Sequence, residues 1–155
     1  IPMSDLSSGD FLNNSLSIKG REVGILICYE VAFTDIVFSS LPKSHFLVNV
    51  SNDAWFGNSI APFQHLQIAR VRALESGRPI LRATNDGLTA LIDHKGGFIA
   101  IGPQFNPAVV SGTVFGRSGT TPYLQYGDYP VLYFSVFIIF LLLYKHFRFG
   151  VDSNH

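Results

Sequence analysis

The chain has a single cysteine among its 155 residues, and this scarcity excludes two kinds of structure. One thiol forms no disulfide framework within the chain and supplies no paired-cysteine zinc motif. The five histidines show no metal-ligand spacing, so we expect no metal site and no cofactor. The chain opens on Ile-Pro-Met without a signal-peptide pattern. We therefore expect it to be the C-terminal portion of a longer protein.

Charge is also scarce. Charged residues make up 14% of the chain, against about 25% in an ordinary soluble domain, and the net charge is zero. No basic footprint for nucleic acid exists, so no nucleic-acid partner is predicted. Aromatic residues contribute another 14%, which excludes a disordered chain. The length suits one domain with a substantial core.

Short apolar runs separated by turn residues predict a layered α/β domain. Strands are predicted at 23–27, 46–50, 79–84, 88–93, 97–101 and 109–115, with one more short strand before residue 22 and helices at 31–41 and 62–76. Pro62 near its start and Gly77 after its end delimit the second helix. A loop is expected at 116–128. The order of these elements is typical of a sheet covered by helices.

The C-terminal segment lacks charge over the 16 residues from Tyr129 to Tyr144. Tyrosines at both ends, followed by Lys145 and Arg148, are typical of a membrane span. The sequence thus predicts a transmembrane helix at 129–149, with residues 150–155 cytoplasmic and residues 1–128 on the other side. A buried C-terminal helix of a soluble core is the alternative.

Cys28 follows the predicted strand at 23–27 and precedes two polar residues. A lone thiol is often only a small buried hydrophobe. A strand end that opens into a loop is, however, where a scaffold exposes a nucleophile, and a thiol is highly nucleophilic once its thiolate is favoured. We therefore treat Cys28 as the candidate nucleophile.

Other candidates each have a structural alternative. Glu30 either orders the nucleophile loop, accepts a proton, or is a solvated acid at a helix N-terminus. Trp55 either lines a ligand site or covers the core. Arg72 and Glu75 are expected to form an ion pair on one helix face. His65 is interpreted as a packing residue rather than the base of a Cys-His pair.

Four motifs together resemble the nitrilase superfamily of carbon–nitrogen hydrolases: residues 27–30 (ICYE), 50–57 (VSNDAWFG), 69–79 (ARVRALESGRP) and 82–87 (RATNDG). With residues 121–123 and the apolar tail, the chain further resembles the apolipoprotein N-acyltransferase family of the bacterial inner membrane. The resemblance implies the α/β fold of a nitrilase-like αββα sandwich, only part of it in this chain. It also implies that residues 1–128 belong to a periplasmic catalytic domain.

The same resemblance implies a reaction. Cys28 would take an acyl chain from a phospholipid as a thioester and pass it to the amine of a diacylglyceryl-modified lipoprotein. The backbone N–H of Tyr29 would belong to the oxyanion hole, and Trp55 would line the route of the acyl chain or lipid. The implied catalytic residues are Cys28, Tyr29 and Glu30, and the implied substrate-binding residues are Asn52, Trp55 and Phe56.

The chain departs from the family pattern in one respect. The family's catalytic Glu and Lys lie upstream of the cysteine, and nothing in the first 27 residues matches either motif; Lys19 and Glu22 stand in the wrong context. We therefore expect the chain alone to be inactive. A soluble amidase or nitrilase, and a non-catalytic fragment that at most binds lipid or a partner, remain the alternative interpretations.

Overall fold

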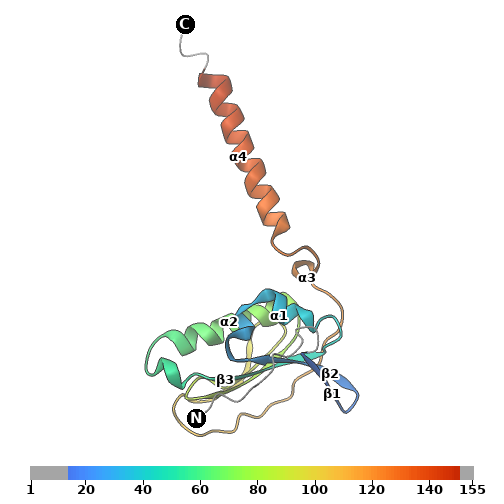
Figure 1. Ribbon diagram of the computed structural model, residues 1–155, viewed down its shortest axis with the longest axis vertical. Coiled ribbons are helices and arrows are strands. Elements are labelled where there is room, and N and C mark those ends of the chain that lie inside the picture. The colour runs from blue at the N-terminus through green and yellow to red at the C-terminus, as the bar shows by residue number, and fades with distance from the viewer. Residues whose placement is uncertain (1–13, 151–155) are drawn as a thin grey trace, which may run out of the picture. The chain divides into compact units, whose positions relative to one another are not determined.

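The computed structural model describes residues 14–150, with the side chains of residues 147, 149 and 150 excepted. The chain divides into two compact units between Thr121 and Pro122. The first unit is built on a sheet and the second is helical (Figure 1).

The first unit contains a six-stranded sheet whose strands lie side by side in sequence order. The strands are β1 (Ser15–Ile18), β2 (Arg21–Ile27), β3 (Phe46–Asn52), β4 (Ile80–Asn85), β5 (Ala90–Ile92) and β6 (Phe98–Ile101). The three central strands β2, β3 and β4 run parallel, and the outer pairs are antiparallel. The carboxyl ends of the three central strands therefore meet at one edge, where polar loops follow them.

Two helices, α1 (Thr34–Ser39) and α2 (Ala61–Ser76), cover one face of the sheet (Figure 1). Pro62 lies in the first turn of α2 and Gly77 ends it with a φ of 63°, as the sequence predicts. The core between helices and sheet is fully or nearly fully buried, and it includes Leu26, Val37, Leu47, Leu66, Ala69, Ala73, Ile80 and Ile92.

Three sequence predictions are wrong. The helix predicted at 31–41 is two elements, the 3-10 helix η2 (Cys28–Ala32) and α1, because Phe33 between them is extended. The loop predicted at 116–128 contains α3 (Pro122–Tyr126). Residues 109–115 form no strand within the described chain. A Cβ on Gly112 would lie 3.0 Å from Leu91 and 3.2 Å from Ile99, so this segment packs against side chains of the sheet.

Residues 14–121 supply one sheet with helices on one face, which corresponds to one half of an αββα sandwich. On the face away from the helices, the segment after β6 crosses the sheet, and Arg117 N–H donates to the His45 carbonyl at 2.8 Å.

The second unit consists of α3 and the 22-residue helix α4 (Tyr129–Gly150). An 18-residue stretch of α4, Tyr129–His146, has a mean hydropathy of 1.5 and none of it is buried. By length and composition α4 is a candidate membrane span, in the place that the sequence predicts.

Candidate active site

Cys28 is the first residue of η2 and directly follows β2, at a sharp turn of the chain. Its φ is +51°, in the left-handed region that residues other than glycine rarely adopt, and its side chain is half-buried. The Glu30 carboxylate accepts a hydrogen bond from Ile27 N–H at 2.7 Å and so closes the turn. Strained backbone of this kind persists only where the surroundings over-determine it. The contacts of Glu30 fit the loop-ordering interpretation.

Helix α2 holds the other end of this turn. Arg72 donates from Nε to the Val31 carbonyl at 3.1 Å and from Nη2 to the Ala32 carbonyl at 2.7 Å. These are the last carbonyls of η2, which lack partners within the 3-10 helix. Arg72 also forms the predicted ion pair with Glu75. The pair is therefore more than a surface feature, because it orients the guanidinium that clamps the turn.

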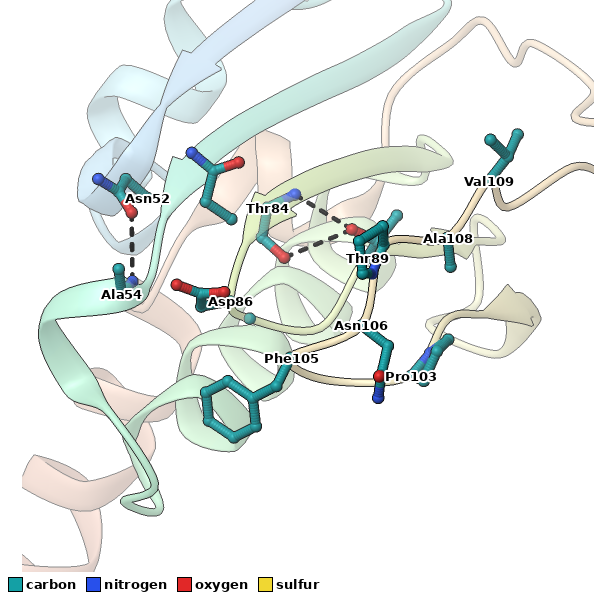
Figure 2. A pocket seen from close by; sticks show the side chains of 13 residues that line it. Asn52, Ala54, Thr84, Asp86, Thr89, Pro103, Phe105, Asn106, Ala108 and Val109 are labelled. Carbon is teal, nitrogen blue, oxygen red and sulfur yellow. Dashed lines mark hydrogen bonds between the residues drawn. The ribbon is translucent and has the colours of Figure 1, made fainter.

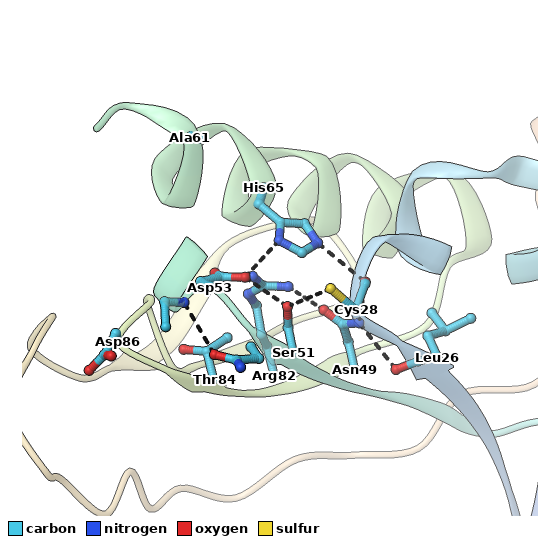
Figure 3. Close-up of polar contacts among 12 residues, drawn as sticks. Leu26, Cys28, Asn49, Ser51, Asp53, Ala61, His65, Arg82, Thr84 and Asp86 are labelled. Carbon is cyan, nitrogen blue, oxygen red and sulfur yellow. Dashed lines mark hydrogen bonds and ion pairs between the residues drawn. The ribbon is translucent and has the colours of Figure 1, made fainter. Parts of the chain in front are cut away.

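A buried polar network surrounds Cys28 (Figure 3). Its Sγ lies 3.4 Å from the Ser51 hydroxyl on β3. Its carbonyl oxygen accepts from Asn49 Nδ2 at 3.1 Å and lies 3.3 Å from Nε2 of His65. Contacts from β3 and α2 thus fix both the backbone and the sulfur of Cys28.

Asp53 is the centre of this network and is fully buried. Its Oδ1 lies 3.0 Å from Nδ1 of His65 and accepts from the Ser51 hydroxyl at 2.7 Å. Its Oδ2 lies 2.8 Å from Nη2 of Arg82, whose Nη1 bonds to Asn49. A buried carboxylate needs such partners, because an unpaired charge in the interior is very costly.

The surroundings of His65 act on its pKa in opposite directions. Burial and the Arg82 cation lower the pKa of His65, while Asp53 and the Cys28 carbonyl oppose that shift. Both ring nitrogens face oxygen acceptors, and the Asp53 carboxylate is the stronger one, so Nδ1 donates to Asp53. His65 is therefore a buried, hydrogen-bonded residue, in line with its interpretation as a packing residue.

Gly87 makes the close packing of this network possible. A Cβ at this position would lie 2.3 Å from Oδ2 of Asp53. The turn after β4 therefore approaches the buried carboxylate more closely than a side chain permits, which gives the Asn-Asp-Gly turn a packing role.

The residues predicted to bind substrate lie on the exposed side of the same edge. Trp55 is 88% exposed in the 3-10 helix η3 (Ala54–Phe56), so it covers no core. Phe56 packs edge-on against His65, with ring centroids 6.4 Å apart. Tyr29 also contacts the His65 ring, at 5.7 Å, and is half exposed. The Asn52 amide oxygen accepts from Ala54 N–H at 3.2 Å, which shapes the loop.

A cavity of about 840 Å³ opens at the carboxyl ends of β3 and β4 (Figure 2). Among the predicted site residues only Asn52 lines it; Cys28, Trp55 and Phe56 do not. Asn52 and Ser51 are neighbours on one strand, so their side chains point to opposite faces. The cavity and the Cys28 network therefore lie on different sides of β3.

Comparison with known proteins agrees with this architecture. A model of a family described as carbon-nitrogen hydrolase matches residues 4–123. The chain belongs to the carbon-nitrogen hydrolase family. The resemblance to the nitrilase superfamily inferred from the four motifs is therefore confirmed.

Carbon-nitrogen hydrolase relatives with curated names are similar over most of this chain. The apolipoprotein N-acyltransferase of Photobacterium profundum is 43% identical over 142 residues, which is 91% of this chain and 28% of that protein. The protein of the same name from Nitrosomonas europaea is 48% identical over 128 residues, 83% of this chain and 26% of that protein. The chain thus spans little more than a quarter of the length of these relatives.

Two solved structures share the fold, which together with the family match confirms the α/β, nitrilase-like fold predicted from the sequence. Saccharomyces cerevisiae Nit3, of the nitrilase superfamily, has a TM-score of 0.52 at 18% identity, over 64% of this chain and 39% of Nit3. An amidase from Nesterenkonia sp. has the same TM-score at 20% identity, over 78% of this chain and 46% of the amidase.

Four residues of this carbon-nitrogen hydrolase site, Asn49, Ser51, Asp53 and Arg82, were assigned no role from sequence patterns. One signal was available. Arg82 stands in an apolar strand at a position that faces the core, and a buried arginine needs strong acceptors, of which a carboxylate is the most effective. Asp53 follows the neighbouring parallel strand and supplies that carboxylate in the structure.

Proposed function

We propose that this chain carries the nucleophile of an N-acyltransferase that acylates bacterial lipoproteins. The observation that carries the proposal is the 43–48% identity to proteins named apolipoprotein N-acyltransferase over a region that includes the Cys28 turn. The half-buried thiol on a clamped, strained turn supports the nucleophile role.

In the proposed reaction, the Cys28 thiolate attacks the ester carbonyl of a phospholipid. The C–O bond breaks, a lysophospholipid leaves with a proton, and an S–C thioester forms. The free amine of the diacylglyceryl-modified N-terminal cysteine then attacks the thioester. An amide N–C bond forms, the C–S bond breaks, and the sulfur is released as a thiol. The Tyr29 N–H, in the first turn of η2, is the proposed oxyanion donor.

The proton acceptor for Cys28 is proposed to come from outside residues 14–150. The Glu30 carboxylate is bonded to Ile27 N–H, and Ser51 presents a hydroxyl to the sulfur. Glu22 lies near the other end of β2, roughly 20 Å from Cys28 along the strand, and Lys19 lies in the turn before β2. This geometry is why we assign the role to the Glu and Lys that the family resemblance implies.

Residues 1–155 expressed alone are therefore expected to give no acyl transfer from phospholipid to a diacylglyceryl lipopeptide in detergent. The longer protein that contains them is expected to give robust turnover. Mass spectrometry of the lipopeptide measures the product. Release of ammonia from simple amides, with no lipopeptide acylation, would instead identify an amidase.

We further propose that α4 spans the bacterial inner membrane, with its Lys145 and Arg148 end in the cytoplasm. Cysteines introduced by Tyr126→Cys and Ser153→Cys in a Cys28→Ala background test this. A membrane-impermeant thiol reagent added from the periplasmic side is expected to label position 126 and not position 153. The reverse labelling would invert the proposed orientation, and labelling of both would exclude a span.

A further inference from the structure

The Ser51 hydroxyl has one hydrogen but two acceptors within reach. Asp53 Oδ1 lies 2.7 Å away and Cys28 Sγ lies 3.4 Å away (Figure 3). A hydroxyl rotates about its C–O bond, so the hydrogen serves one acceptor at a time. With a neutral thiol the carboxylate is the stronger and closer acceptor. When Cys28 is a thiolate, its sulfur carries a full negative charge and competes with Asp53 for the Ser51 hydrogen.

The surroundings of Asp53 allow its bond from Ser51 to be given up. Nδ1 of His65 stays on Oδ1 at 3.0 Å, and Nη2 of Arg82 stays on Oδ2 at 2.8 Å. A buried carboxylate with two remaining donors, one of them a guanidinium, is still satisfied. Without His65 and Arg82, rotation of the Ser51 hydroxyl would leave the Asp53 carboxylate without these side-chain hydrogen-bond donors.

We propose that Ser51 is a catalytic residue whose hydroxyl turns from Asp53 to Cys28 Sγ when the sulfur becomes a thiolate, and turns back when the thioester forms. This inference rests on the proposed nucleophile role of Cys28. Ser51 keeps its own proton throughout, and the proton of the thiol leaves to the separate base. The result is a hydrogen-bond donor that stabilises the attacking and leaving forms of the sulfur only.

The charges around the sulfur fit this role. Arg82 from β4 faces both Asp53 and Cys28: burial lowers the pKa of Arg82, and negative charge on Asp53 and Cys28 opposes that shift. Burial and Arg82 lower the pKa of His65 on α2, and the Glu30 carboxylate in η2 accepts a hydrogen bond from Ile27 N–H. Of Arg82, His65 and Glu30, the Arg82 guanidinium is therefore the permanently charged cation that interacts electrostatically with a Cys28 thiolate.

Alkylation by iodoacetamide of the full-length protein in detergent tests the proposal without acyl donor or acceptor. Ser51→Ala is expected to slow alkylation of Cys28 at pH 7 roughly fivefold and to move its pH profile to higher pH, because the charged form loses a donor. Ser51→Thr, which keeps the hydroxyl, is expected to restore the wild-type profile. Ser39→Ala removes a serine hydrogen bond elsewhere, at 2.7 Å to the Ile36 carbonyl, and is the matched control.

A wild-type alkylation profile in a folded Ser51→Ala protein would overturn the proposal. So would a fivefold loss that Ser51→Thr fails to restore, because that result indicates a purely structural role. Should Ser51→Ala not fold, as judged by limited proteolysis, Ser51→Val removes the same hydroxyl, has the shape of the Ser51→Thr variant, suits a strand and carries the same expectation. Because alkylation needs no acyl transfer, failure of this inference is distinct from failure of the proposed function.

Discussion

Replacing Cys28 by serine is expected to lower acyl transfer to a lipopeptide by a factor on the order of 10³ or more. A hydroxyl needs far stronger activation than a thiol, and the Ser51 hydroxyl that contacts Cys28 Sγ is a donor rather than a base. The turn itself should persist, because Glu30 and Arg72 hold its backbone. The product is measured by mass spectrometry at equal protein concentration.

Cys28→Ala serves as a second loss variant, and Ser39→Ala as the control that should retain wild-type turnover. The thermal midpoint of each variant is compared in parallel. A Cys28→Ser or Cys28→Ala protein with activity near that of the wild type would remove Cys28 from the chemistry.

Asp53→Asn is expected to destabilise the domain by about 3–5 kcal/mol, which lowers the unfolding midpoint by on the order of 10 °C. The substitution leaves Arg82 buried without its counter-charge, and the two side chains are both fully buried. Thermal unfolding in detergent, followed by far-ultraviolet circular dichroism, gives the midpoint.

Asp35→Asn is the matched control for this variant. Asp35 lies exposed in the first turn of α1, so its loss should cost less than about 1 kcal/mol. Combining Asp53→Asn with Arg82→Met should cost less than the sum of the single changes, because the pair is lost only once. Additive costs, or a midpoint unchanged by Asp53→Asn, would contradict the buried ion pair.

Local patterns in the sequence were sufficient for most of the fold. Continuous apolar runs predicted β2, β3 and β4, and Pro62 with Gly77 delimited α2, because these signals act within one element. The strand predicted at 109–115 is wrong because the conformation of this segment depends on contacts with distant residues. Its composition suits a strand, but Gly112 packs against Leu91 and Ile99, and no local pattern reports that contact.

The candidate active site likewise contains one residue that the sequence made recognisable and a cluster that it did not. Cys28 was recognisable because a thiol at the end of an apolar strand is a local signal. The Asp53–His65–Arg82 cluster joins three segments, from the end of β3, α2 and β4, and depends on the parallel register of the sheet. Sequence periodicity identifies the strands but leaves their neighbours open, so the partners of Asp53 became visible only in the folded chain.

The central claim is an acyl thioester on Cys28, and peptide mass spectrometry tests it most directly. The protein that contains this chain is incubated with phospholipid in the absence of an acceptor and then digested with trypsin. The peptide of residues 22–43, which contains Cys28, is predicted to gain the mass of one acyl chain and to lose it in neutral hydroxylamine. Acyl transfer to a lipopeptide by a protein whose 22–43 peptide is never acylated would contradict the account.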